Sequence, residues 1–156
     1  RGAFRIARQR AAPFANVLVR LEREGAAGWG EASPNPFYAE DAASVQRKIQ
    51  EASTRLRDLP LRTHHDVEQA WQELWPILSP SRAAQCAIDL ALWDWLARRE
   101  QTTVCELALG HTPRDVTSFA TIGLGSPEGF REKLANLHGF PRIKIKSDQQ
   151  ADLSPV

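Results

Sequence analysis

Two lysines separated by one residue give the sharpest chemical signal in the chain. Lys144 and Lys146 lie in the segment Arg142-Ile143-Lys144-Ile145-Lys146, and on a β-strand their side chains would share one face. Their Cα atoms would then lie about 6.6 Å apart, and two neighbouring ammonium groups disfavour each other's charge. A neutral lysine amine can act as a general base near neutral pH. The alternative interpretation of the same pattern is an ordinary solvated strand face.

The elements around this pair decide whether the lysines belong to a site. A strand over 116–122, a helix from Ser126 to Gly139 and a strand over 140–146 are predicted. This order predicts two parallel strands with a right-handed crossover, and it puts the lysines at the carboxyl end of the second strand, where such folds keep their sites. A closed barrel takes about 250 residues, so the domain that starts near 110–115 is expected to be cut short.

Two further residues could contact a substrate. Thr121 lies near the end of the strand over 116–122, where the alternative is an ordinary β-former. Arg8 follows the apolar segment Phe4-Arg5-Ile6, and its alternative is a lone surface arginine. The sequence holds no Ser or Cys nucleophile motif, and Gly123-x-Gly125 is too short for a phosphate-binding loop.

Residues 4–32 are predicted to form an antiparallel meander. Apolar and other residues alternate over Asn16–Leu21, Gly25 supplies a turn, and a return strand starts at Gly28. The segment Phe4–Ala7 is expected to add a strand before these two. Two prolines soon after residue 32 end the sheet, because proline cannot donate to a strand ladder.

Apolar spacing and capping residues predict four helices after the meander. The predicted spans are 45–56, 63–78, 81–99 and 103–110. Thr63 with Asp66 and Thr103 with Glu106 resemble capping boxes. The helix over 81–99 is apolar almost all round, so it is expected to be buried on most sides.

Two carboxylates interrupt the most apolar stretch of the chain, residues 83–97. Asp89 and Asp94 leave this stretch too short and too polar to span a bilayer, so no membrane partner is expected. Both are interpreted as capping or hydrogen-bonding partners at domain contacts and not as a metal pair. The adjacent residues His64 and His65, at the start of the helix predicted over 63–78, face different directions, which disfavours a metal site formed by these two histidines.

Composition limits the class of protein further. The 20 Lys and Arg against 19 Asp and Glu give a net charge of +1, which argues against a strongly basic nucleic-acid binder. A hydrophobic content of 42% with five Trp excludes disorder by composition. Cys86 and Cys105 are too few for a disulfide framework or a Cys-type zinc site, so free thiols in a reducing cytoplasm are the default. Without Met or a signal-peptide pattern, the chain is expected to start inside a longer reading frame.

The order of these features resembles the enolase superfamily, and more narrowly its muconate-lactonizing subgroup with dipeptide epimerases of the L-Ala-D/L-Glu epimerase type. The likeness covers nearly the whole chain. Gly28-Trp29-Gly30-Glu31-Ala32 and Asp89-Leu90-Ala91-Leu92-Trp93-Asp94 resemble the superfamily's capping domain, and Lys144-Ile145-Lys146 resembles the subgroups that use a lysine base. Thr121 and Arg8 carry the narrower likeness to dipeptide epimerases.

The resemblance implies an α+β capping domain over 1–112, made of an antiparallel meander plus helices, and then, over 113–156, the first β-α-β of a truncated TIM-type (β/α)7β barrel. It implies that Lys146 is the acid/base at the substrate α-carbon, and that Lys144 contacts the substrate carboxylate and helps to hold Lys146 neutral. Thr121 would contact the substrate, and Arg8 would bind the distal carboxylate of a small dipeptide. Family members stabilise the enediolate with Mg2+ held by three carboxylates on later strands.

The sequence departs from this pattern at its carboxyl end. It stops at Val156, before the strands that would supply the metal ligands, and Ser147 replaces the Gly usual after the lysine pair. The isolated chain is therefore expected neither to bind Mg2+ specifically nor to epimerise dipeptides. A homo-oligomer is one option for the full-length protein, whose oligomeric state the sequence leaves open.

Two other functions remain open at this point. The first is another lysine-base member of the superfamily, namely a muconate cycloisomerase, an o-succinylbenzoate synthase or an N-acylamino-acid racemase. The second, of a different class, is a non-catalytic helical interaction module whose Trp residues lie in the core or face a partner.

Overall fold

The computed structural model describes residues 5–6, 9–10, 15–112, 114–123 and 125–146. The chain divides into two compact units. One is Phe14–Pro113, and the other groups Arg1–Pro13 with Arg114–Val156. We call the first the helical unit and the second the β-α-β unit.

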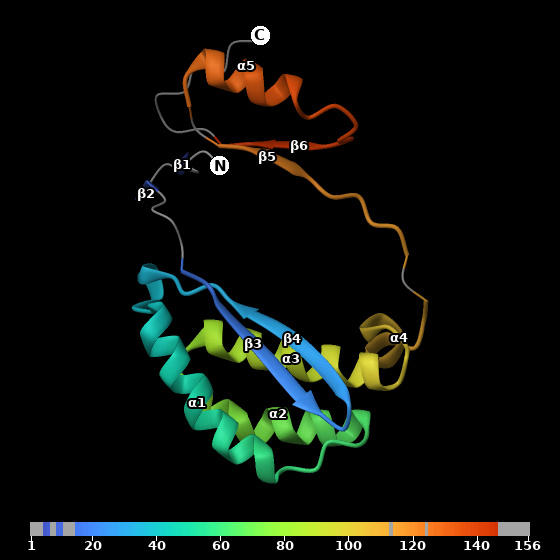
Figure 1. Cartoon of the computed structure of the whole chain (residues 1–156). Helices are drawn as coiled ribbons and strands as arrows, with labels where there is room; N and C mark the ends of the chain where they lie inside the picture. The colour runs from blue at the N-terminus through green and yellow to red at the C-terminus, as the bar shows by residue number, and fades with distance from the viewer. Residues whose placement is uncertain (1–4, 7–8, 11–14, 113, 124, 147–156) are drawn as a thin grey trace. The chain divides into compact units, whose positions relative to one another are not determined.

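A β-hairpin opens the helical unit (Figure 1). Strands β3 (Val17–Arg23) and β4 (Ala26–Ala32) pair antiparallel over their whole length. Between them Glu24 and Gly25 have φ values of 52° and 79°, the left-handed pair that a two-residue hairpin turn requires. The turn predicted at Gly25 is confirmed.

The meander predicted over 4–32 is wrong in one respect within the described residues. The strand at Arg5–Ile6 (β1) pairs with Gln9–Arg10 (β2) and not with β3. In the sequence β1 lies much nearer to β2 than to β3, so pairing with β2 costs less loop-closure entropy. The alternation in the sequence identified the strands but did not determine this partner.

Four helices follow the hairpin, after a short 3-10 helix, η1 (Pro36–Tyr38). They are α1 (Ala42–Asp58), α2 (His64–Leu78), α3 (Arg82–Arg99) and α4 (Val104–Leu109). Thr63 and Thr103 begin α2 and α4 with the predicted capping boxes, and Gly110 ends α4 at a φ of 68°. All four predicted helices are thereby confirmed.

Helix α3 forms the centre of the helical unit and contacts β3, β4, α1, α2 and α4 (Figure 1). Its side chains are buried on most faces, and Trp95 is completely buried. The Trp95 indole donates a hydrogen bond of 3.0 Å to the carbonyl of Arg23. This burial agrees with the apolar pattern predicted over 81–99.

Two glycines allow β4 to lie directly on α3. A Cβ atom added to Gly30 would lie 1.9 Å from the carbonyl oxygen of Ala87, and one added to Gly28 would lie 2.3 Å from that of Ala91. Both carbonyl oxygens belong to the backbone of α3, so they cannot move away from an added Cβ by a side-chain rotation. The Gly-x-Gly spacing on β4 and the alanines on α3 therefore form one close contact between strand and helix.

The two carboxylates of α3 have different environments. Asp94 accepts hydrogen bonds from the backbone N–H of Trp29 at 2.8 Å and from Nε of Arg98 at 2.9 Å, so its predicted role as a hydrogen-bonding partner is confirmed. Asp89 is half-buried, and burial raises the pKa of its carboxyl although a side-chain hydrogen bond from Trp93 opposes the shift.

The β-α-β unit contains β5 (Ala120–Ile122), α5 (Pro127–Ala135) and β6 (Ile143–Ile145). The two strands pair parallel, as predicted. Both are shorter than predicted, because only the residues that find a partner across the pair form a ladder. The predicted helix end at Gly139 is wrong: α5 ends at Ala135, and the N–H of Asn136 is shared between two carbonyls of a tightened last turn.

No helix in the described part of the chain combines the length and the apolar character that crossing a membrane requires.

Candidate functional site

The parallel pair β5–β6 positions three of the four predicted site residues. Thr121 is the register partner of Lys144, between the pairs Ala120 with Ile143 and Ile122 with Ile145. The backbone N–H of Lys146 donates a hydrogen bond of 3.0 Å to the carbonyl of Ile122. The ladder therefore continues one residue beyond β6 and fixes the backbone of Lys146 beside the end of β5.

The two faces of β5 differ in exposure, whereas Ile145 of β6 is 56% exposed although it is the register partner of Ile122. Ala120 and Ile122 are buried, at 7% and 1% exposed, while Thr121 between them is exposed. Strand alternation places Lys144 on the face of Thr121 and Lys146 on the same face two residues further on. Lys144 is exposed and Lys146 is half-buried. A hydroxyl and two amines are thus carried by neighbouring backbone positions at the carboxyl end of two parallel strands.

These side chains can bind a carboxylate and exchange a proton. Amines and a hydroxyl all donate hydrogen bonds to carboxylate oxygens, and an uncharged lysine amine can accept a proton from carbon. The side chain of Lys144 is exposed. Arg8, the fourth predicted residue, lies outside the described residues.

The described residues of this arrangement do not form a metal site. Over the described ranges, no group of three or more His, Cys, Asp or Glu side chains is placed to hold a metal ion. The Mg2+ that the resemblance implies needs several carboxylates, and none of the described site residues Thr121, Lys144 and Lys146 carries one.

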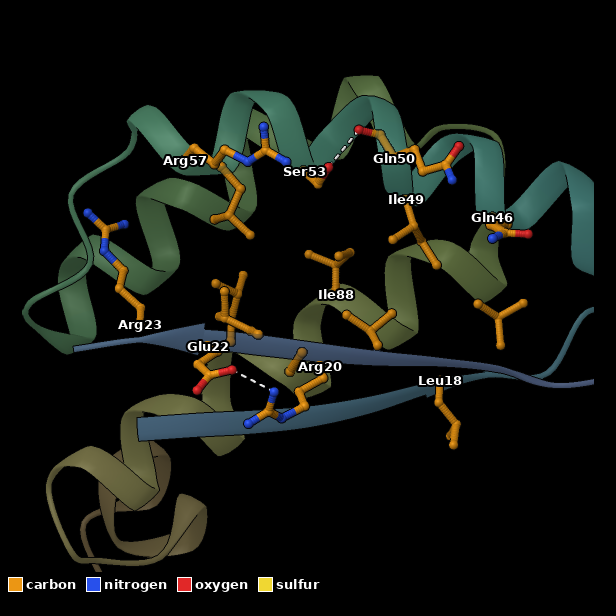
Figure 2. Close-up of a pocket in the computed structure, with 16 residues that line it drawn as sticks. Leu18, Arg20, Glu22, Arg23, Gln46, Ile49, Gln50, Ser53, Arg57 and Ile88 are labelled. Atoms are coloured by element: carbon orange, nitrogen blue, oxygen red, sulfur yellow. Dashed lines mark hydrogen bonds and ion pairs between the residues drawn. The ribbon is translucent and has the colours of Figure 1, made fainter. Parts of the chain in front are cut away.

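The helical unit contains an open groove between β3 and α1, with a volume of about 670 Å³ (Figure 2). Ile49 of α1 and Ile88 of α3 point into it, while Leu18 points to the other side of the hairpin. Two polar groups at its edge have local partners: Arg20 pairs with Glu22, and the Ser53 hydroxyl donates to the carbonyl of Gln50. The groove therefore has an apolar floor, to which Ile49 and Ile88 contribute, and polar side chains along its edge.

A buried carboxylate was missed by the sequence analysis. Glu40 is only 8% exposed, and its Oε1 accepts hydrogen bonds from the Ser81 hydroxyl at 2.8 Å and from the N–H of Ala83 at 3.2 Å. It thereby ties the segment after β4 to the amino terminus of α3, where the helix dipole also favours negative charge. That segment carries the exposed rings of Phe37 and Tyr38. The sequence predicts a helix start near Ser81 but gives no sign of a partner 41 residues away.

Comparison with known proteins gives a family match over most of the chain. Residues 2–110 match the model of the mandelate racemase/muconate lactonizing enzyme family, N-terminal domain. The L-Ala-D/L-Glu epimerase of Escherichia coli strain K12 is 35% identical over 134 residues, which cover 85% of this chain and 39% of that protein. The o-succinylbenzoate synthase of Listeria innocua is 26% identical over 147 residues, covering 90% of this chain and 38% of the synthase.

Structural comparison extends this likeness to the β-α-β unit. An enolase family member from Agrobacterium tumefaciens, described as homologous to dipeptide epimerases and solved with sodium and L-Ala-L-Glu, superposes with a TM-score of 0.78 and 28% identity. The match covers 97% of this chain and 44% of the other. The present chain thus spans about two-fifths of the length of the proteins it is similar to.

Proposed function

Since the chain belongs to the mandelate racemase/muconate lactonizing enzyme family, whose N-terminal domain it contains, we propose that it forms the amino-terminal part of a dipeptide epimerase. In this proposal residues 1–112 are the capping domain, and residues 113–156 begin a (β/α)7β barrel with β5, α5 and β6. The activity belongs to a longer protein, because the chain spans only 39% of the Escherichia coli epimerase.

The reaction is removal of the proton on the carbon next to a carboxylate of a small dipeptide, followed by delivery of a proton to the opposite face of the same carbon. In this proposal that delivery falls to a second acid, a lysine on a later strand outside this chain. Lys146 is the acid/base at this carbon, Lys144 binds the adjacent carboxylate, Thr121 contacts the substrate, and Arg8 binds a distal carboxylate. The register pair of Thr121 with Lys144 on parallel strands carries the proposal, because it supports a site formed by Thr121 and the two lysines at one strand end.

A magnesium ion would stabilise the dianionic intermediate that proton removal creates. The described residues do not supply its ligands, so in this proposal the carboxylates come from outside this chain and no step here depends on the metal. For the same reason we propose that the 156-residue chain alone is inactive.

The alternative of another lysine-base enzyme is supported by the similarity to o-succinylbenzoate synthase. The interaction-module alternative is less well supported. Exposed lysines on an antiparallel edge would favour it, whereas β5 and β6 are parallel. Trp75 is 49% exposed and its ring lies 5.3 Å from that of Trp71, but Trp71 packs on the core.

The experiment uses the purified longer protein that contains this chain. We expect it to interconvert L-Ala-L-Glu and L-Ala-D-Glu, measured by chiral chromatography, and we expect the isolated 156-residue chain, purified from an epimerase-free host, to leave both unchanged. Turnover of an o-succinylbenzoate precursor with no change in either dipeptide would instead favour the alternative enzyme.

Substitution of Arg8 separates the two enzymes further. Arg8→Ala in the longer protein should lower kcat/KM for Glu-containing dipeptides much more than for dipeptides without a distal carboxylate, since one charge-assisted contact is removed. An equal effect on both classes of dipeptide would contradict the role proposed for Arg8.

A further inference from the structure

We draw no further inference here: the strongest candidate, the apolar groove between β3 and α1, is an open face for which nothing among the described residues shows what covers it.

Discussion

Replacing Gly30 by alanine tests the strand–helix contact at the centre of the helical unit. The new Cβ would lie 1.9 Å from the carbonyl oxygen and 2.8 Å from the carbonyl carbon of Ala87. Because both atoms belong to the backbone of α3, the clash can be relieved only if β4 and the helix move apart. Such a movement would loosen the packing of β4 along the whole contact.

The cost can be set against ordinary glycine effects. In an unstrained strand, alanine is better than glycine by about 0.5–1 kcal/mol, so a gain would be expected if there were no clash. Forcing extra atoms into a well-packed core costs about 1–3 kcal/mol or more, and a clash with backbone belongs at the upper end. We therefore expect Gly30→Ala to lower the free energy of unfolding by about 3 kcal/mol.

Thermal unfolding of the full chain, followed by Trp fluorescence, measures this loss. At roughly 4–8 °C per kcal/mol for a domain of this size, the Tm should fall by roughly 12–24 °C. Gly25→Ala is the matched control: Gly25 has a φ of 79° and no atom within 4 Å of an added Cβ, so only about 1–2 kcal/mol of backbone strain is expected. A Gly30→Ala variant as stable as Gly25→Ala would refute the packing described for β4.

Two further changes test the buried carboxylates. Glu40→Ala leaves the Ser81 hydroxyl and the Ala83 N–H without their acceptor, so it should lower the free energy of unfolding, measured in urea, by about 1–3 kcal/mol. Glu40→Gln keeps an oxygen acceptor and should lower it less. Equal losses of stability in the two variants would contradict the hydrogen-bonding role of Glu40. Burial raises the pKa of the Asp89 carboxyl above its ordinary value of 3.8. The contribution of this carboxyl to the stability of the folded chain is therefore fully present below pH 3.8 and is lost as the pH rises through the folded-state pKa. Asp89→Asn cannot ionise and keeps an acceptor for Trp93, so the variant should be more stable than the parent chain at pH 7. The difference in stability should become smaller as the pH falls towards about 3. A difference that does not change with pH would exclude this explanation.

Local signals made the helices predictable. The acceptor and donor of each capping box, such as Thr63 and Asp66, lie three residues apart, so the sequence itself contains both partners. The end of α4 was predictable for a similar reason, because Gly110 readily adopts the left-handed conformation that ends a helix. At the end of α5, where Asn136 and not glycine follows the last helical residue, the prediction extended too far, to Gly139.

Pairings between distant residues were only partly predictable. The strand–helix–strand order predicts that β5 and β6 are parallel, but the match of Thr121 with Lys144 depends on register, which strand alternation alone does not fix. The same limit explains the error over β1, whose partner is β2, and the failure to single out Glu40, whose partners lie more than 40 residues away. Each of these depends on tertiary contacts and not on neighbours in the sequence.

Exchange of the substrate α-proton with solvent tests the role of Lys146 most directly. The longer protein that contains this chain is incubated with L-Ala-L-Glu in D2O, and loss of the glutamate α-proton is followed by NMR. We expect Lys146→Ala to slow exchange by about 10²- to 10⁴-fold, while Lys133→Ala, which removes an exposed lysine of α5, leaves the rate unchanged. Exchange at the parental rate in Lys146→Ala would contradict the assignment of Lys146 as the base.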